Sequence, residues 1–345
     1  MANKIKIGNT IKVRLDYIIN NIINRKIFFT MLVQFTQLLF RSLLTYKVVL
    51  LLGLATFSSC NSDKRSSHAD DRISVVTTTT MITDMVNQIA GDKVQLNGLM
   101  GPGVDPHLYE PIPSDGIALS EADLILYNGL FLEGQMISNL KDYGGIDFGS
   151  TVPEDQLRGE KSYPDPHIWG NAEIWANCVP LVVEALSEAD TSNSSYYKER
   201  GDHFMKVLLE LHQWARSRVR SLPEDSRILI TSHDAFEYFG EAYGLKVVAL
   251  QGISTATEAG IAERVKLVDF IQKNKIKSIF VESSVSPEAI KSIAEDSGIT
   301  IGGELFSDAM GEPGDIEKSN DEEYDLGTYQ GMLKHNINTI VEALK

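Results

Sequence analysis

The sequence predicts an α/β protein with two lobes, each with a parallel sheet flanked by helices, joined by one long spanning helix. Short runs rich in β-branched residues alternate with helical patterns over residues 73–192 and again over residues 223–345. Strands that alternate with helices are typical of parallel sheets covered by helices. Residues 193–222, between these two regions, have helical periodicity and no strand signal. The length of 345 residues agrees with about two domains.

In the N-terminal lobe, residues 73–192, strands are expected over residues 73–78, 94–100 and 124–127, and helices over residues 81–90, 134–141 and 171–189. Ser114 is expected to cap a further short helix. Pro180 lies inside the last helix and should kink or interrupt it, because proline has no backbone N–H to donate.

The spanning helix is predicted from apolar residues that recur at helical spacing before Pro223. These residues are Phe204, Val207, Leu208, Leu211, Trp214, Ala215 and Val219. The alternation then returns in the C-terminal lobe, residues 223–345. Strands are expected there over residues 227–231, 247–250, 278–281 and 299–305, and helices over residues 235–243, 257–273, 287–296 and 328–344.

The charge of the chain excludes some classes of partner. There are 32 Lys and Arg against 47 Asp and Glu, which gives a formal net charge of −15. Residues 1–59 hold eight of the basic side chains and one acidic one, so residues 60–345 carry a net charge of −22. A surface this acidic argues against nucleic acid and suits cations. Cys60 and Cys178 are the only cysteines, so neither a disulfide framework nor a cysteine-based zinc cluster is possible.

The N-terminal segment, residues 1–59, is predicted to be a signal for export. A basic flank precedes the apolar run of residues 48–57, and Ser58 and Ser59 stand directly before Cys60. This arrangement is typical of a secretory signal and resembles a bacterial lipobox, in which the cysteine is lipidated. Residues 60–72 are then expected to be the lipidated Cys60 and a flexible tether. The alternative is an uncleaved anchor with an incidental cysteine.

Four polar side chains follow expected strands or stiff loops, where open parallel sheets bind ligands. They are His107, His167, His233 and Asp308, two from each half. Three imidazoles and a carboxylate form a closed tetrahedral set that suits zinc and other late first-row ions, and the carboxylate also accepts manganese. The sequence therefore predicts a metal site, against the alternative that these are core or surface histidines and that Asp308 caps a helix or turn.

Other polar residues are given more ordinary roles. His203, His212 and His335 fall inside amphipathic helices and are assigned to packing or surface, and Cys178 is expected in the core. Glu282 is either a partner of a ligand or a surface carboxylate. The acidic segment of residues 315–325 is expected to be a solvated loop, with cation attraction as the alternative.

Several motifs resemble the zinc/manganese-binding lipoproteins of bacterial metal ABC importers. GPGVDPHLYEP at residues 101–111 is similar to the first-ligand loop of that family, and DPHIW at 165–169 to the second. TSHDAF at 231–236, FVESSVSP at 280–287 and GELFSD at 303–308 are similar to the later strand ends. The matches run in order from about Val75 to Lys345. The resemblance implies two lobes, a spanning helix, a metal held between the lobes, and His107, His167, His233 and Asp308 as its ligands.

The resemblance also implies a function in transport rather than catalysis. The chain would be an exported, membrane-anchored monomer that captures Zn²⁺ or Mn²⁺ and passes it to an ABC permease driven by an ATPase. Neutral histidines are required, so affinity should fall below about pH 6.5. A metal-dependent hydrolase is the rival interpretation, with Glu110 or Glu282 as base, but it needs an open coordination position. A surface lipoprotein adhesin on the same fold is the third.

The choice between zinc and manganese stays open. Many zinc-specific members carry a histidine-rich loop between the first two ligands, and residues 108–166 contain no histidine. Manganese-dedicated members often have Glu as the third ligand, and this chain has His233. Zinc should bind more tightly at any such site.

Overall fold

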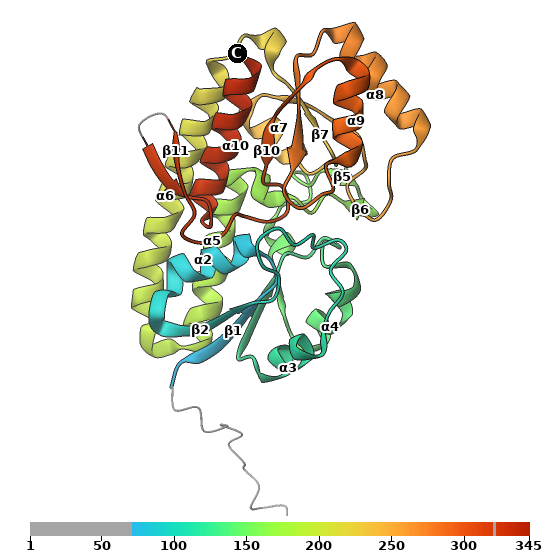
Figure 1. Ribbon diagram of the computed structural model, residues 1–345. Helices are drawn as coiled ribbons and strands as arrows, with labels where there is room; N and C mark the ends of the chain where they lie inside the picture. Colours follow the sequence, from blue (N-terminus) through green and yellow to red (C-terminus); the bar gives the residue numbers. More distant parts are fainter. Residues whose placement is uncertain (1–70, 320–321) are drawn as a thin grey trace, which may run out of the picture. The chain divides into compact units, whose positions relative to one another are not determined.

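The computed structural model describes residues 71–319 and 322–345, and Arg72–Lys345 form one compact unit (Figure 1). The predicted signal, Cys60 and nearly all of the predicted tether lie outside the described residues. No helix among the described residues is long and apolar enough to cross a membrane. The predicted α/β class with parallel sheets flanked by helices is confirmed.

The first sheet is parallel throughout and has the strand order β2-β1-β3-β4. Its strands are β1 (Ile73–Thr77), β2 (Val94–Gly98), β3 (Leu124–Tyr127) and β4 (Ile146–Asp147). Ile73 pairs with Val94, and Val75 with Leu124, so the three longer strands end at the same edge. The loop of residues 101–111 therefore begins at this edge.

Helices α2 (Thr80–Ala90), α3 (Pro113–Glu121), α4 (Ile137–Asp142) and α5 (Ala172–Ala189) belong to the same half of the chain. Of the two effects expected at Pro180, an interruption is wrong, because α5 continues through it, and a kink stays a prediction. Proline removes one hydrogen bond from the helix. Cys178, Val179 and Val182, which flank Pro180, are buried, and their packing holds the helix together on both sides of the lost bond.

The long helix α6 (Ser194–Arg220) has 27 residues and confirms the helix expected before Pro223. At 1.5 Å per residue it is about 40 Å long. It packs against α2 and α5 from the first half and against α7 (Glu237–Tyr243) and α10 (Tyr329–Leu344) from the second (Figure 1).

Four strands form two parallel pairs in the second half. The strand β7 (Ile228–Thr231) pairs with β8 (Lys246–Ala249), and β9 (Ser278–Glu282) pairs with β10 (Thr300–Leu305). The strands β7 and β9 are neighbours. Helices α8 (Ile261–Asn274) and α9 (Glu288–Ser297) pack against each other beside them, and α8 begins four residues later than expected.

Two hairpins were not predicted, β5 (Gly159–Glu160) with β6 (Tyr163–Pro164) and β11 (Ile316–Ser319) with β12 (Glu322–Asp325). The hairpin of β11 and β12 occupies residues 316–325, where a solvated loop was expected over residues 315–325. The expectation of a loop is therefore wrong. Tyr324 is buried, and its hydroxyl donates to Glu317 at 2.6 Å. Lys318 pairs with Glu323 across the strands at 2.5 Å. A high density of charge hid this hairpin, in which Tyr324 is the buried residue.

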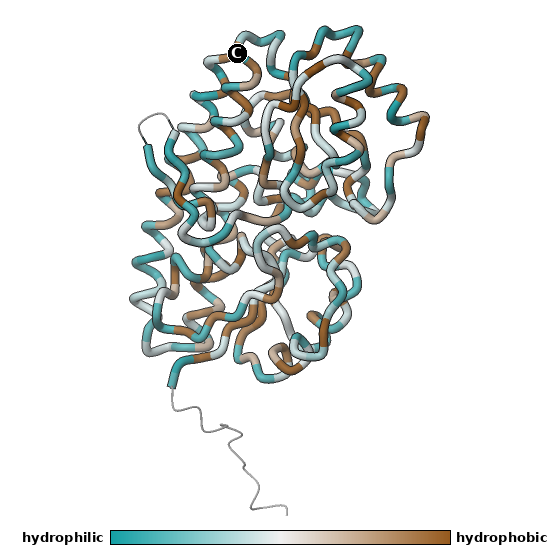
Figure 2. The backbone as a smooth tube through the Cα atoms, viewed as in Figure 1, coloured by the Kyte–Doolittle hydropathy of each residue, from teal (hydrophilic) through white to brown (hydrophobic). Residues whose placement is uncertain are grey.

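The largest hydrophobic cluster contains residues from α2, α5, α6 and α10 and from both sets of sheets. Hydrophobic and hydrophilic residues alternate along the helices, and the strands carry longer hydrophobic stretches (Figure 2). Two smaller clusters lie around β9, α8 and α9 and around β3 and α3. The main core is thus continuous through α6, and the division at residues 192 and 223 stays a prediction.

Candidate metal centre

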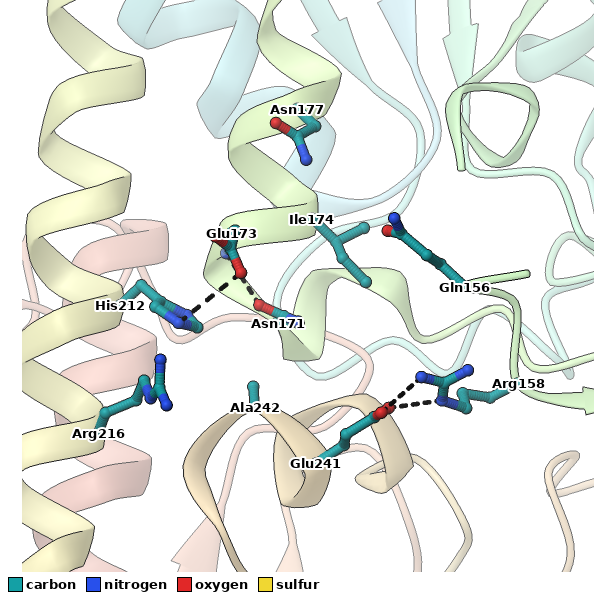
Figure 3. Close-up of a pocket in the computed structure, with 10 residues that line it drawn as sticks. All are labelled: Gln156, Arg158, Asn171, Glu173, Ile174, Asn177, His212, Arg216, Glu241 and Ala242. Carbon is teal, nitrogen blue, oxygen red and sulfur yellow. Dashed lines mark hydrogen bonds and ion pairs between the residues drawn. The ribbon is translucent and has the colours of Figure 1, made fainter. Parts of the chain in front are cut away.

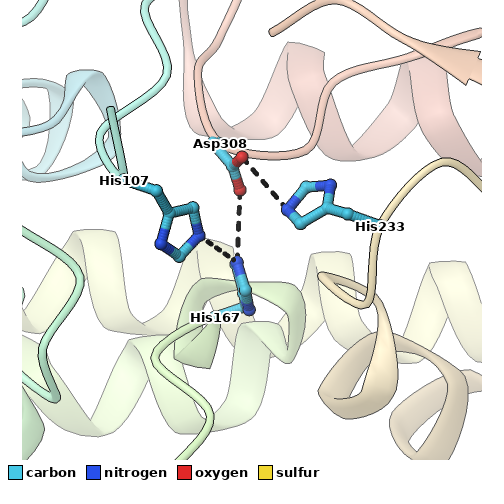
Figure 4. A group of neighbouring side chains, drawn as sticks. All are labelled: His107, His167, His233 and Asp308. Carbon is cyan, nitrogen blue, oxygen red and sulfur yellow. Dashed lines mark hydrogen bonds and ion pairs between the residues drawn. The ribbon is translucent and has the colours of Figure 1, made fainter. Parts of the chain in front are cut away.

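Four side chains point toward one another from loops of both halves of the chain (Figure 4). One ligand atom from each of His107, His167, His233 and Asp308 lies within 4.8 Å of the others. His107 follows β2, His233 follows β7, Asp308 follows β10, and His167 stands just before α5. The structure thus brings together all four residues that the sequence singled out.

His167 is completely buried and oriented by the aspartate two residues before it. Asp165 Oδ1 accepts hydrogen bonds from both the backbone N of His167, at 2.9 Å, and its ring Nδ1, at 2.7 Å. Since Nδ1–H is thereby engaged, the lone pair of the neutral ring is on Nε2, which faces the cluster. Sequence reasoning gave Asp165 no role, although the repeated Asp-Pro-His was the signal that could have found it.

His233 has the same kind of support from a distant carboxylate. Glu282, at the end of β9, accepts from His233 Nδ1 at 2.6 Å, and its other oxygen accepts from the backbone N of Ser232 and of His233. Glu282 is itself buried, so the alternative of a surface carboxylate is wrong.

Asp308 lies between two of the imidazoles. Its Oδ1 is 3.3 Å from His167 Nε2, and its Oδ2 is 3.2 Å from His233 Nε2. Its chain neighbours are tied to the first half, because Ser307 O accepts from the Trp169 indole and Met310 N donates to Thr80 Oγ1. These two bonds bury Asp308 between the halves of the chain, so its burial does not require that it caps a helix or a turn.

His107 is only half-buried, unlike the other three. Its Nε2 is 3.2 Å from His167 Nε2. Among the described residues no carboxylate pairs with its Nδ1, which distinguishes this ring from His167 and His233.

The electrostatics of the cluster follow from burial and from these carboxylates. Burial lowers the pKa of His107 to about 4, and Asp308 offsets only part of that effect. Burial also acts on His167, but Asp165 and Asp308 outweigh it and raise its pKa to about 9. Burial is likewise outweighed at His233 by Asp308 and Glu282, which raise its pKa well above the ordinary value. Burial would raise the pKa of Asp308, but His233 and His167 hold it well below its usual range.

The donor set suits a small divalent cation. An ion bound at about 2.0–2.1 Å in a tetrahedron places its ligand atoms about 3.3 Å apart. The three close separations in the cluster are 3.2, 3.3 and 3.2 Å. His233 Nε2 and Asp308 Oδ1 are buried without a hydrogen bond to the described residues. Buried polar atoms of this kind call for a partner, and a cation would supply it.

The other three histidines among the described residues lie away from this cluster. His203 is exposed on α6, and His335 bonds to Glu317 at 2.6 Å and to the carbonyl of Glu304. His212 is buried and lines a separate polar cavity of about 470 Å³ beside α5, α6 and α7 (Figure 3). Cys178 is buried as expected, and burial raises the pKa of its thiol to about 12.

Comparison with known proteins agrees with this architecture. Residues 75–343 match the family described as zinc-uptake complex component A, periplasmic (ZnuA). The chain belongs to this family. Members of the ZnuA family are binding components of metal importers and not enzymes, so the hydrolase interpretation is wrong.

Three relatives show how far the likeness to the ZnuA family extends. The chain is 40% identical to the manganese-binding lipoprotein MntA of Bacillus subtilis, covering 84% of this chain and 96% of that one. It is 42% identical to the zinc-binding protein TroA of Treponema pallidum, over 86% and 96%. It is 33% identical to the manganese ABC transporter substrate-binding lipoprotein PsaA of Streptococcus mitis, over 86% and 97%. The TroA structure matches with a TM-score of 0.74, over 79% of this chain and 99% of that one.

Proposed function

We propose that this protein captures Zn²⁺ or Mn²⁺ with His107, His167, His233 and Asp308 and presents the ion to the permease of an ABC importer. The observation that carries the proposal is the convergence of three imidazoles and one carboxylate within 4.8 Å. Two of those imidazoles have a carboxylate on the nitrogen that faces away from the cluster. Such pairs fix the tautomer and raise the basicity of a metal-binding histidine.

Four protein ligands suit carriage better than chemistry. A catalytic zinc site keeps a position for water, whereas a set of four closes a tetrahedron. The ion is therefore the cargo of this site. Its release would come from movement of a ligand loop, with the permease and its ATPase as the partners that drive transport.

The nature of the cargo follows from the donor atoms. Imidazole nitrogen favours zinc, and the carboxylate also accepts manganese. Relatives bear the names of both ions. Zinc should bind more tightly at equilibrium, so supply and release would decide whether manganese is carried.

The cellular setting is part of the same proposal. Export, lipidation at Cys60 and the tether of residues 60–72 would hold a monomer at a membrane surface. Residues 73–192 and 223–345 would act as the two lobes around the ion, joined by residues 193–222. The alternative of a surface lipoprotein adhesin on the same fold stays a prediction.

The test is elemental analysis and competitive titration of the metal-stripped protein with zinc and manganese. The wild type should bind a single equivalent, and His233→Ala should weaken binding sharply and leave the circular dichroism spectrum unchanged. His203→Ala, which removes an exposed histidine of α6, is the matched control and should bind as the wild type does. No stoichiometric binding of either ion, or wild-type affinity in His233→Ala, would reject the proposed site.

A further inference from the structure

The two Asp-Pro-His segments build the same local turn. Asp105 Oδ1 accepts from the backbone N of His107 at 2.8 Å, and Asp165 Oδ1 accepts from the backbone N of His167 at 2.9 Å. In both cases the aspartate holds the backbone of the histidine two residues later. This turn is a common use of aspartate, and it requires only local sequence.

The two aspartates differ in what else they bind. Asp165 turns to its own histidine and accepts from the His167 ring at 2.7 Å. Asp105 instead uses its second oxygen to accept from the hydroxyl of Thr255 at 2.6 Å, across 150 residues of sequence. Asp105 thus joins the backbone of His107 to Thr255 in the second half of the chain. It does not support the His107 ring as Asp165 supports the His167 ring.

Thr255 is attached to the turn that carries His233. It lies six residues after β8, and the intervening chain is bonded to residues 231–234. Leu250 N donates to Thr231 O, Gln251 N to Ser232 O, and Asp234 N to Gly252 O, at 2.9–3.2 Å. Thr255 is only 9% exposed, whereas Ala256 and Thr257 are exposed. The segment therefore directs one hydroxyl inward, onto Asp105.

We propose that Thr255 is a positioning residue that holds His107 in place through Asp105 and so limits how fast the bound ion leaves. The inference rests on the proposed function, since it concerns release from that site. Thr255 and Asp105 join the His233 turn to the His107 loop, so the two ligands keep a fixed separation. Without this bond, the loop of residues 101–111 loses a direct hydrogen bond to the segment that carries Thr255.

The other three ligands explain why release is the affected step. His167, His233 and Asp308 are at most 1% exposed, and each has further bonds that hold it. They can receive an ion before His107 closes on it. Loosening His107 therefore speeds departure of the ion much more than it slows capture.

The experiment measures zinc dissociation from the full-length protein by stopped flow into excess chelator. Thr255→Val removes the hydroxyl at nearly constant volume and should speed dissociation about tenfold or more, the effect expected for a lost hydrogen bond to a charged group. Thr255→Ser, which keeps the hydroxyl, should restore a rate near that of the wild type. Thr257→Val makes the same chemical change at the exposed neighbour and should leave the rate unchanged.

The decisive comparison places Thr255→Val in a His107→Ala background. If Thr255 acts through His107, it has no further effect once the imidazole is gone, whereas a general loss of structure speeds dissociation in both backgrounds. Thr255→Ala replaces Thr255→Val if the valine variant does not fold. An unchanged rate in the single variant, or equal acceleration in both backgrounds, overturns the inference. A wild type that binds no zinc rejects the proposed function itself, so the two failures are distinguishable.

Discussion

The indole N–H of Trp169 donates to the carbonyl of Ser307 at 2.8 Å, across 138 residues of sequence. Trp169 stands two residues after His167, and Ser307 directly precedes Asp308. The bond therefore connects the segments that carry two of the proposed ligands. Both residues are buried, so water does not compete for this bond.

Trp169→Phe should weaken zinc binding and destabilise the metal-free protein by about 1–2 kcal/mol. The change keeps most of the aromatic volume and leaves the Ser307 carbonyl buried without its donor. Zinc titration and thermal unfolding measure the two effects. Trp175→Phe is the matched control, because the buried Trp175 Nε1 has no hydrogen-bond partner among the described residues. Equal effects of the two substitutions would contradict the role given to the Trp169 bond.

Glu282→Gln should lower metal affinity about 10- to 100-fold, as loss of a carboxylate behind a metal-binding histidine generally does. The amide keeps the shape of Glu282 but removes the charge that supports His233. The change in affinity is measured by competition with a calibrated chelator. Glu317→Gln alters a histidine–carboxylate pair of the same 2.6 Å length at His335, outside the cluster. It should bind metal as the wild type does, and a similar loss there would show that the effect is not specific to His233.

Metal binding at pH 7 should release protons. Despite burial, Asp165 and Asp308 raise the pKa of His167 to about 9, and Asp308 and Glu282 raise that of His233, which favours the protonated rings in the metal-free protein, whereas burial lowers the pKa of His107 to about 4. A metal ion binds only neutral imidazole, so affinity should keep rising with pH beyond the value of about 6.5 expected for ordinary histidines. Calorimetry in buffers of different ionisation enthalpy counts the protons. Binding without proton release would show that the carboxylates do not charge these rings.

Asp84→Asn should flatten the dependence of stability on pH. Burial raises the pKa of Asp84 to about 6 from 3.8, and bonds from Tyr329 N and Gln88 only partly oppose this. A raised folded-state pKa contributes stability below pH 3.8 that is lost as the pH rises through about 6. The full shift corresponds to about 3 kcal/mol, and the wild type should lose about 2.5 kcal/mol of this relative to the variant between pH 4 and 7.

Denaturant unfolding of the metal-free protein at a series of pH values tests the role of Asp84. Asp123→Asn is the control, because Asp123 is exposed yet also accepts a backbone N–H, from Ser74 at 2.8 Å. The free energy of unfolding of Asp123→Asn should change with pH as that of the wild type does. If the same were true of Asp84→Asn, the buried carboxyl of Asp84 would not control how stability depends on pH.

Local pattern accounts for much of the fold and for the choice of candidate ligands. The apolar spacing before Pro223 predicted α6, which ends at Arg220. Loops at the carboxyl ends of parallel strands are where ligand-binding residues are expected, and His107 follows β2 and His233 follows β7, strands of two different sheets. Pattern failed at Pro180, where packing on both sides preserves α5, and at residues 316–325, where dense charge hid a hairpin.

The sequence by itself determined the α/β class, the long helix and the identity of His107, His167, His233 and Asp308 as one candidate set. Only the tertiary structure decided the distant partners of this set, whereas Asp165 lies just two residues before the His167 ring that it supports. Glu282 supports His233 across 49 residues, and Thr255 reaches Asp105 across 150. Periodicity reports only on neighbours within a few turns of helix or strand, so contacts at such separations carry no local signal. The contact of Glu282 with His233 forms when β7 and β9 come together, and that of Thr255 with Asp105 when the two halves of the chain pack against each other.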